Sequence, residues 1–315
     1  MMRQNLVREI VFSELGSHPV SEFFRQEHLS LALGLLLDDG RKSVVKVRPH
    51  ESKHEACAQV QRALFAAGFP CARLLAGPIR CEDSSVSIEE YVEPPVGESY
   101  GLAPTAQVSG RALHWMMSLA PHPEDVPDLG FAPAWLGWDH PGSGLWPAPD
   151  DGPEDLNAID APAWLADASR QVRSVLTSAT SSRVIGHGDW EAQNVFWADG
   201  RLAVVHDWDS LVCLPESAIV GAAAGVFAVA GSEPSWPTLE DSRGLLRGYL
   251  EARAQASSAT LWGGWADEDE RVFWAAGLWV HLFNAMKAIA RGEFAPWEER
   301  TRQRVQERLP LMNTP

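Results

Sequence analysis

The sequence predicts an α+β protein with two lobes, a small N-terminal lobe built on a mixed β-sheet and a larger, mainly helical C-terminal lobe. Strand patterns around one helix fill residues 1–95, whereas helical patterns dominate residues 96–315. All 14 tryptophans lie at or after Trp115. Residues 1–95 carry 11 Lys and Arg against 13 Asp and Glu, whereas residues 96–315 carry 15 against 29. The Pro-containing stretch 93–97 therefore marks the predicted boundary between domains 1–95 and 96–315.

The N-terminal lobe begins with a predicted hairpin. Residues 29–37 and 43–47 are apolar strands, and Asp39-Gly40 supplies a two-residue turn between them. Apolar residues then recur at helical spacing, which predicts a helix that starts near Pro49 and closes at Gly68. Residues 87–92 predict a further strand next to the boundary.

The C-terminal lobe is predicted to be mostly helical. A different stretch, residues 121–162, carries nine of the 22 prolines and is expected to be a loop-rich insert that is either functional or mobile. The predicted helices are 106–119, 163–176, 218–229, 242–254, 270–290 and 296–309.

Charge and cysteine content exclude several classes of protein. The net charge of −16 argues against nucleic acid as a partner, because phosphate backbones are bound by basic patches. None of the four cysteines forms a CxxC pair, so reduced thiols in a cytoplasmic protein are expected. No signal peptide is predicted at the N-terminus. The longest uncharged stretch, 217–232, is shorter than the roughly 20 apolar residues of a membrane span, so no membrane is expected.

The most informative segment is a predicted hairpin in the second lobe. Residues 186–197 read GHGDWEAQNVFW, Asp199-Gly200 forms a two-residue turn, and the apolar run 202–205 follows. This register places position 194 opposite position 205.

That register predicts how three polar residues lie relative to one another. Asp207 would share a face with Asn194, with alpha carbons roughly 7–8 Å apart. An amide and a carboxylate at that separation suit one magnesium ion, which prefers few protein ligands together with substrate phosphates. Asp189 lies in the loop before the hairpin, next to the predicted metal. The alternative is that all three are ordinary polar residues around a turn.

Two motifs resemble those of the aminoglycoside phosphotransferase and choline kinase superfamily, distant relatives of protein kinases. HGDWEAQN at 187–194 resembles the catalytic loop HGDxxxxN, and VHDWDS at 205–210 resembles the metal-binding segment. The resemblance covers residues 44–292 in outline and implies a two-lobed, protein-kinase-like fold. It also implies transfer of the γ-phosphate of ATP or GTP to a hydroxyl of a small molecule.

The same resemblance assigns roles to single residues. Asp189 would orient the acceptor hydroxyl and take its proton, and Asn194 and Asp207 would hold Mg²⁺ on the nucleotide phosphates. His187 would brace the loop. No activation segment is recognisable after Asp207, which disfavours a protein side chain as the acceptor.

Lys46 is a charged residue within an apolar strand. It is either a solvated lysine or, as the resemblance implies, the lysine that contacts the α- and β-phosphates. In the second case it needs a carboxylate partner on the following helix, for which Glu55 is preferred and Glu51 remains open. The main-chain groups of Glu90 and Val92 would then hold the purine.

One departure from the family pattern concerns the turn over the phosphates. The family has a Gly- or Ser-rich turn between the first two strands, whereas residues 24–30 here contain no glycine. This leaves the choice between ATP and GTP open. It also motivates the alternative of a pseudokinase that binds nucleotide or another ligand without turnover.

A competing motif lies at residues 50–54. The sequence HESKH fits HExxH, the zinc metalloprotease signature, whose two histidines lie one helical turn apart. No third histidine follows at position 60, and no downstream Glu stands out as a ligand. The protease reading is therefore the weaker alternative.

The acceptor is predicted only by class. Acidic residues of the insert would attract a cation such as an aminoglycoside or another antibiotic, or are simply solvated surface. Tryptophans of the insert would form an aromatic wall for the acceptor or pack an irregular loop. The oligomeric state is not predicted. The acidic residues are Asp150, Asp151, Glu154, Asp155, Asp160 and residues 267–270, and the tryptophans are Trp135, Trp138 and Trp146. In the late helix, polar groups would line the pocket and apolar residues would pack in the core, among Trp279, His281, Asn284 and Lys287.

Overall fold

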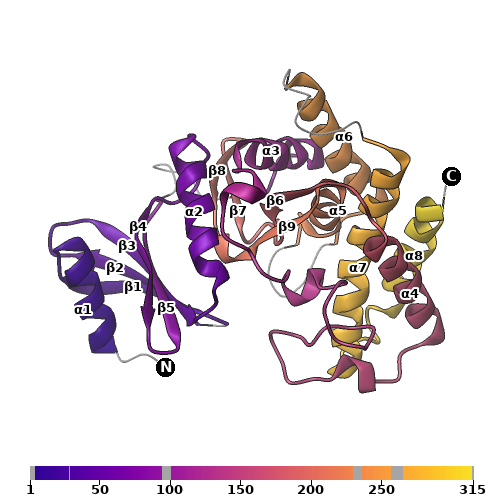
Figure 1. Ribbon diagram of the computed structural model, residues 1–315, viewed down its shortest axis with the longest axis horizontal. Helices are drawn as coiled ribbons and strands as arrows, with labels where there is room; N and C mark the ends of the chain where they lie inside the picture. The colour runs from indigo at the N-terminus through magenta and orange to yellow at the C-terminus, as the bar shows by residue number, and fades with distance from the viewer. Residues whose placement is uncertain (1–3, 28, 94–100, 230–235, 257–264, 314–315) are drawn as a thin grey trace.

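The computed structural model describes residues 4–27, 29–93, 101–229, 236–256 and 265–313. Two lobes are visible, with the N-terminal sheet at one end of the molecule and the helical part at the other (Figure 1). The fold class predicted from the sequence is therefore confirmed. Most of the predicted boundary stretch lies at residues 94–100, outside the described residues.

The N-terminal lobe is a five-stranded sheet in the order β1-β2-β3-β5-β4. All four strand pairings in it are antiparallel, where a mixed sheet was expected, because three of its connections are hairpins. Helix α1 and strands β1 and β4 were not predicted. The elements are α1 (Gln4–Leu15), β1 (Pro19–Glu27), β2 (Leu31–Leu37), β3 (Lys42–Pro49), α2 (Lys53–Ala66), β4 (Leu74–Cys81) and β5 (Ser84–Glu90).

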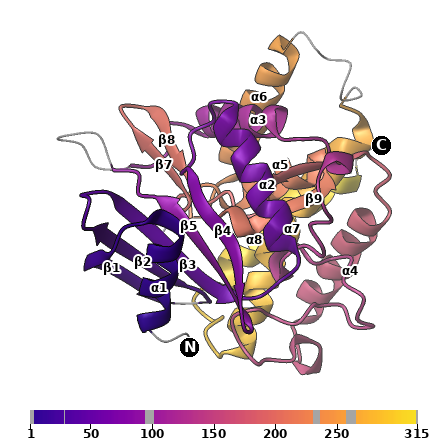
Figure 2. The same ribbon diagram turned by 60° about the vertical axis from the view of Figure 1, so that its left-hand side comes forward.

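The two faces of this sheet differ in chemistry. One face is apolar and packs against Val7 and Val11 of α1, which lies across the sheet in Figure 2. Because side chains alternate along a strand, Val45 and Val47 point to that face, and Lys46 and Arg48 point to the other. The polar face is the one that meets the second lobe.

Helix α2 begins four residues later than predicted. Pro49 is still the last residue of β3, so the helix starts at Lys53 and not near Pro49. Its end agrees with the prediction, since Gly68 has a φ of +81°. The buried side chains of α2 belong to the hydrophobic core of the larger lobe and not to that of the sheet; they include Ala56, Cys57, Val60 and Leu64.

The C-terminal lobe contains the predicted helices with small shifts at their ends. It also has two short antiparallel ribbons, β6 paired with β9 and β7 paired with β8. The helices are α3 (Ala106–Leu119), α4 (Ala163–Thr177), α5 (Glu216–Val226), α6 (Leu239–Gln255), α7 (Asp267–Ala290) and α8 (Glu298–Arg308), and the strands are β6 (Arg183–His187), β7 (Val195–Ala198), β8 (Arg201–Val205) and β9 (Leu211–Pro215).

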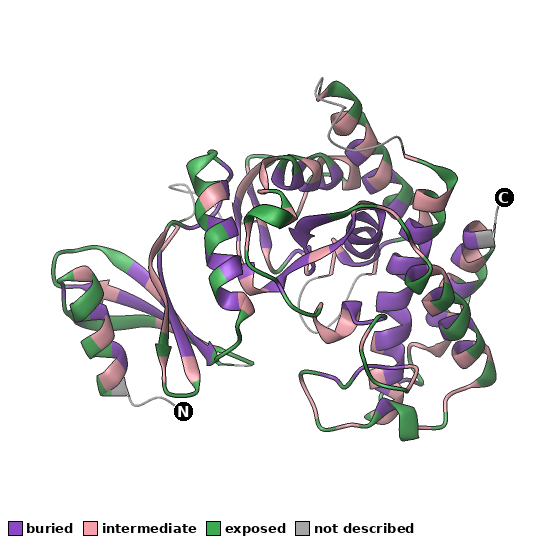
Figure 3. Cartoon of the chain, viewed as in Figure 1, coloured by how far each residue is buried: buried purple, intermediate pink, exposed green. Residues whose placement is uncertain are grey.

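Helices α5 and α7 form the centre of this lobe and are buried along most of their length (Figure 3). They approach so closely that a Cβ on Gly221 would lie 2.1 Å from the carbonyl oxygen of Phe273, which leaves room only for glycine. Helix α7 alone, among the described helices, is long and apolar enough to cross a membrane. Its most apolar window is 83% buried, which accounts for its composition as a core helix.

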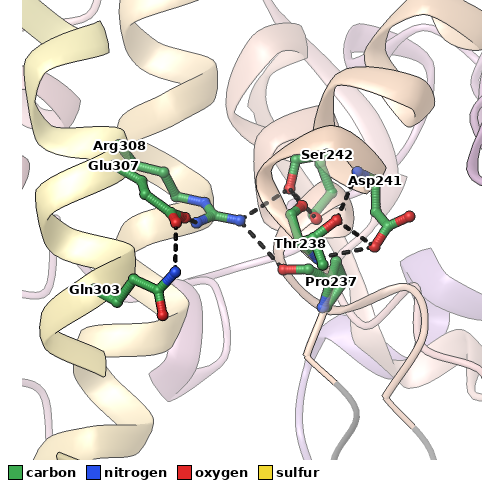
Figure 4. Close-up of polar contacts among 8 residues, drawn as sticks. Pro237, Thr238, Asp241, Ser242, Gln303, Glu307 and Arg308 are labelled. Atoms are coloured by element: carbon green, nitrogen blue, oxygen red, sulfur yellow. Dashed lines mark hydrogen bonds and ion pairs between the residues drawn. The ribbon is translucent and has the colours of Figure 1, made fainter. Parts of the chain in front are cut away.

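The C-terminal helix is held against the start of α6 by a buried arginine. The guanidinium of Arg308, 2% exposed, donates to the carbonyl of Pro237 at 3.2 Å and pairs with Glu307 at 3.2 Å (Figure 4). Thr238 and Asp241 form the capping box that opens α6 beside it.

The insert at residues 121–162 is loop-rich as predicted and contains only three short 3₁₀ turns, η1 (Pro123–Asp125), η2 (Ala134–Leu136) and η3 (Leu156–Ala158). Trp138 and Trp146 are buried, and the ring of Trp146 packs 5.0 Å from that of Trp279. These tryptophans therefore pack the loop and do not form a wall open to a ligand.

Candidate active site

The β7–β8 hairpin carries the predicted polar residues, but its register differs by one residue. Ala198 pairs with Arg201 as expected, whereas Phe196 pairs with Val204, so Ala203 is an extra residue on β8. As a result Asn194 lies opposite His206, whose amide donates to the Asn194 carbonyl at 2.8 Å. The predicted pairing of 194 with 205 is wrong, because turn rules do not reveal a bulge.

Asp207 comes directly after the residue that lies opposite Asn194, so the expected strand alternation that placed both on one face does not apply. Asp207 has a φ of +61° and a ψ of +54°, a left-handed conformation uncommon outside glycine. Its carboxylate accepts a 2.5 Å hydrogen bond from the hydroxyl of Ser210, in the 3₁₀ turn η4 (Trp208–Ser210). This local contact holds the strained residue in place.

The loop before the hairpin is fixed by a buried histidine. His187 donates through Nε2 to the carbonyl of His206 at 2.9 Å and accepts through Nδ1 from the amide of Asp189 at 3.2 Å. Burial lowers the pKa of His187, which keeps the ring neutral for this pair of contacts. The bracing role implied by the resemblance therefore fits its surroundings.

Gly188 has no room for a side chain. A Cβ there would lie 2.9 Å from each of three atoms: Leu136 Cδ1, the Ser210 carbonyl oxygen and Val212 Cγ1. Its carbonyl accepts from the indole Nε1 of Trp135, in the insert, at 2.9 Å. The insert thus contacts the backbone directly before Asp189.

Asp189 and Asn194 are in direct contact. The Asn194 amide donates to Oδ2 of Asp189 at 2.7 Å and to the Asp189 carbonyl at 3.0 Å. Burial raises the pKa of Asp189, and the nearby carboxylate of Asp207 raises it further. Asp207 directly follows His206, whose amide donates to the Asn194 carbonyl, so the three predicted residues lie in one neighbourhood.

This neighbourhood fits a hard cation. Nδ2 of Asn194 is the donor in both contacts with Asp189, so these contacts leave the Oδ1 atom of Asn194 able to bind a metal ion. Asp207 supplies a carboxylate, only one oxygen of which is engaged by Ser210. Amide and carboxylate oxygens are the ligands that Mg²⁺ takes in proteins.

The nucleotide side of the site requires one correction. Lys46 pairs with Glu89 of β5, with Nζ to Oε2 at 3.2 Å, and not with the predicted Glu55 or with Glu51. Glu55 and Glu51 are exposed. The helix α2 contributes the amide of Gln61 instead, which donates to Oε1 of Glu89 at 3.2 Å. The resemblance implies a partner on the following helix, whereas the carboxylate here comes from the neighbouring strand β5.

A second charge pair joins the lobes. Arg48 Nη2 lies 2.9 Å from Oδ1 of Asp209, two residues after Asp207, and 3.1 Å from the hydroxyl of Ser87. Burial raises the pKa of Asp209, and Arg48 opposes that effect. Neither residue was predicted.

The strand before the boundary ends in the segment predicted to hold a purine. The amide of Glu90 donates to the Arg73 carbonyl at 2.8 Å, so this amide is already used within the lobe. Val92 lies two residues on and is partly exposed. A contact of either residue with a base stays a prediction.

The HExxH motif does not form a zinc site. His50 precedes the start of α2 and contacts the hydroxyl of Ser85 at 2.8 Å, whereas His54 is buried on the helix. Within the described residues, no group of three or more His, Cys, Asp or Glu side chains is arranged to hold a metal. The protease reading is therefore wrong, since its two histidines do not share a helix face.

Comparisons with known proteins bear on the fold. No family model and no curated protein matches the sequence. Solved structures match over nearly the whole chain. The chain has the fold of the aminoglycoside phosphotransferases and the choline and ethanolamine kinases.

Three of these structures illustrate the likeness. A spectinomycin phosphotransferase, APH(9)-Ia, with ADP and spectinomycin is 12% identical at a TM-score of 0.56, covering 97% of this chain and 94% of its own. The amicoumacin kinase hAmiN with AMP-PNP, Ca²⁺ and its ligand is 12% identical at 0.64, covering 100% and 95%. A choline/ethanolamine kinase family protein from Mesorhizobium loti is 15% identical at 0.57, covering 100% and 96%.

Proposed function

We propose that this protein is a magnesium-dependent phosphotransferase that moves the γ-phosphate of a nucleoside triphosphate to a hydroxyl group of a small molecule. The observation that carries the proposal is the cluster of Asp189, Asn194 and Asp207. Lys46 lies on the polar face of the sheet together with Arg48, which pairs with Asp209 two residues after Asp207. The kinase-like fold of the chain supports the same reading.

Asn194 and Asp207 are the residues that would hold Mg²⁺. The ion, when bound, neutralises charge on the phosphates of the nucleotide. In this chain, Ser210 fixes Asp207, and Asp189 fixes the side chain of Asn194 through the amide nitrogen. Both ligand residues are thus held in place by neighbouring groups, which lowers the entropy lost on binding.

Asp189 is the proposed catalytic base. The carboxylate would accept a hydrogen bond from the acceptor hydroxyl, orient its oxygen towards the phosphorus and take its proton as the new bond forms. Burial and Asp207 raise the pKa of Asp189, which makes the carboxylate a better proton acceptor near neutral pH. His187 holds the loop from behind.

ATP or GTP is the proposed donor. Lys46 would contact the phosphates, and the main chain at Glu90 and Val92 would contact the base. Structures with the same fold contain ADP or AMP-PNP, which favours ATP. The four cysteines are free thiols, in keeping with a cytoplasmic enzyme.

A cationic small molecule is the proposed acceptor, which includes antibiotics of the aminoglycoside type. The charge of Asp150 raises the pKa of Asp189, and no side chain among the described residues forms a hydrogen bond or close ion pair with Asp150, on which Lys287 and Lys53 act only as nearby charges. Its neighbour Asp151 is already paired with Lys287 at 2.6 Å and with Arg291 at 3.1 Å. Asp150 therefore remains to bind a cation beside the catalytic base.

Triphosphate turnover tests this proposal. Release of ADP or GDP from Mg·ATP or Mg·GTP is followed with a panel of cationic and neutral alcohols, in wild type and Asp189→Asn. We expect acceptor-dependent turnover that Asp189→Asn lowers by about 10²-fold or more. Equal residual rates in the two proteins would reject the proposal.

The panel also decides the alternative of a pseudokinase, which the absence of glycine at residues 24–30 favours. A pseudokinase would bind Mg·ATP in a thermal-shift assay and show no acceptor-dependent turnover with any member of the panel.

A further inference from the structure

Lys46 is held by a carboxylate from its own sheet. On β3 and β5 Lys46 is opposite Ser87, so Glu89 lies diagonally across on the same face. Nζ of Lys46 lies 3.2 Å from Oε2 and 3.2 Å from Oε1 of Glu89. The two side chains are only 16% and 4% exposed, so this is a buried ion pair.

The helix provides a neutral donor at this point. Gln61 of α2 is 3% exposed, and its amide nitrogen donates to Glu89 Oε1 at 3.2 Å and to the Ala72 carbonyl at 3.0 Å. Gln61 and Lys46 therefore contact the same oxygen atom of Glu89. A carboxylate in place of the Gln61 amide would face Glu89 at this distance and repel it.

We infer that Glu89 is the positioning residue that holds Lys46 towards the phosphates of the nucleotide, and that Gln61 fixes Glu89 from α2. The inference rests on the proposed function, because it assumes that Lys46 contacts phosphate. It assigns to strand β5 the carboxylate that the family resemblance implies on the helix.

The electrostatics of the cluster agree with this role. Burial lowers the pKa of Lys46, but Glu89, then Asp209 and Asp207, raise it to a net increase, so the ammonium form persists. One cation and one anion with a neutral amide leave the cluster without net charge. Lys46 can therefore meet a phosphate without the repulsion that a second buried carboxylate would add.

The test is a cycle of variants with a nucleotide-binding readout. The dissociation constant of mant-ATP with MgCl₂ is measured for wild type, Glu89→Gln, Lys46→Met and the double variant, with thermal unfolding as a check on folding. Glu89→Gln should weaken binding about tenfold, the size expected for one charged hydrogen bond. In the Lys46→Met background the same change should matter less than about twofold, because the effect passes through Lys46.

Matched variants sharpen the result. Glu55→Gln makes the same chemical change on an exposed carboxylate of α2 and should bind mant-ATP like wild type. Gln61→Glu combined with Glu89→Gln returns one carboxylate to the cluster and should recover part of the lost affinity. If Glu89→Gln does not fold, Glu89→Asp takes its place in the same cycle.

Three results would overturn the inference: wild-type affinity in Glu89→Gln, an equal loss with and without Lys46, or no recovery in the exchanged pair. The rate at which an amine reagent labels Lys46 keeps the test independent of the proposed function. Removal of the Glu89 charge should increase labelling of Lys46 at alkaline pH, even if mant-ATP binds none of the proteins. Absence of nucleotide binding with altered labelling would reject the proposed function and retain only the pairing by which Glu89 holds Lys46.

Discussion

Replacement of Arg48 should lower the free energy of unfolding, because it leaves the carboxylate of Asp209 unpaired between the lobes. Arg48 is 9% exposed and Asp209 22%, and a single contact of 2.9 Å joins them. Breaking a buried pair by deleting one partner costs about 3–5 kcal/mol in general. Because only Nη2 engages Asp209, and Nε and Nη1 have no partner among the described residues, we expect the low end, about 3 kcal/mol.

The assay is urea unfolding of wild type, Arg48→Met, Asp209→Asn and the double variant. The double variant should be more stable than Arg48→Met, with a coupling energy of about 1–3 kcal/mol. Arg111→Met is the control, because Arg111 pairs with Glu251 at 3.2 Å on the surface, where both side chains are over 40% exposed. That change should cost no more than about 1 kcal/mol.

The pH dependence has a definite sign. Burial raises the pKa of Asp209, and loss of Arg48 raises it further. An acid whose pKa is raised on folding stabilises the protein when protonated and loses that contribution as the pH rises through its folded-state pKa. Arg48→Met should therefore lose less stability at pH 5 than at pH 8. Strictly additive single variants, or an equal loss at both pH values, would refute this reasoning.

Three further predictions concern the catalytic loop. Gly188→Ala should lower stability by about 1–3 kcal/mol in thermal unfolding, because its Cβ meets three atoms at 2.9 Å; unchanged stability would contradict the described packing. Trp135→Phe removes the donor to the Gly188 carbonyl and should lower kcat about tenfold with little change in the KM for nucleotide, whereas an unchanged kcat would remove the insert from catalysis. Asp150→Asn removes a charge that raises the pKa of Asp189. Because activity is lost as Asp189 is protonated, the acidic limb of the pH profile of kcat/KM should move to lower pH. An unmoved limb would show that Asp150 does not lie near Asp189.

The polar constellation was predictable because it depends on local sequence. A two-residue turn at Asp199-Gly200 and the spacing of Asp189, Asn194 and Asp207 bring these groups together over a short stretch of chain. The bulge at Ala203 was not predictable, since one extra residue leaves the apolar pattern of β8 unchanged. Its effect on the pairing of Asn194 appears only in the backbone.

The charge pairs of Lys46 and Arg48 depend on residues that are distant in the sequence. Glu89 lies in the strand SSVSIEE next to a second glutamate, so the sequence does not indicate which of the two is buried against Lys46. Nothing in the sequence near Arg48 or Asp209 indicates that they meet, because their contact depends on how the lobes pack. Helix α1 was not predicted, although Val7 and Val11, which pack on the sheet, have helical spacing in the sequence.

Because α2 packs on the larger lobe, a chimaera of two proteins with this fold should not be joined at residue 95. Its apolar side chains complete the larger core, and the following Cys71 bridges to Val205 of β8. A chimaera that joins a foreign segment 1–95 to this C-terminal part would replace a piece of that core and strip β8 of a neighbour. An exchange that replaces α1 and the five strands of the sheet but keeps residues 53–71 preserves the larger core and the neighbour of β8. The unit that can be transplanted is therefore the sheet without α2.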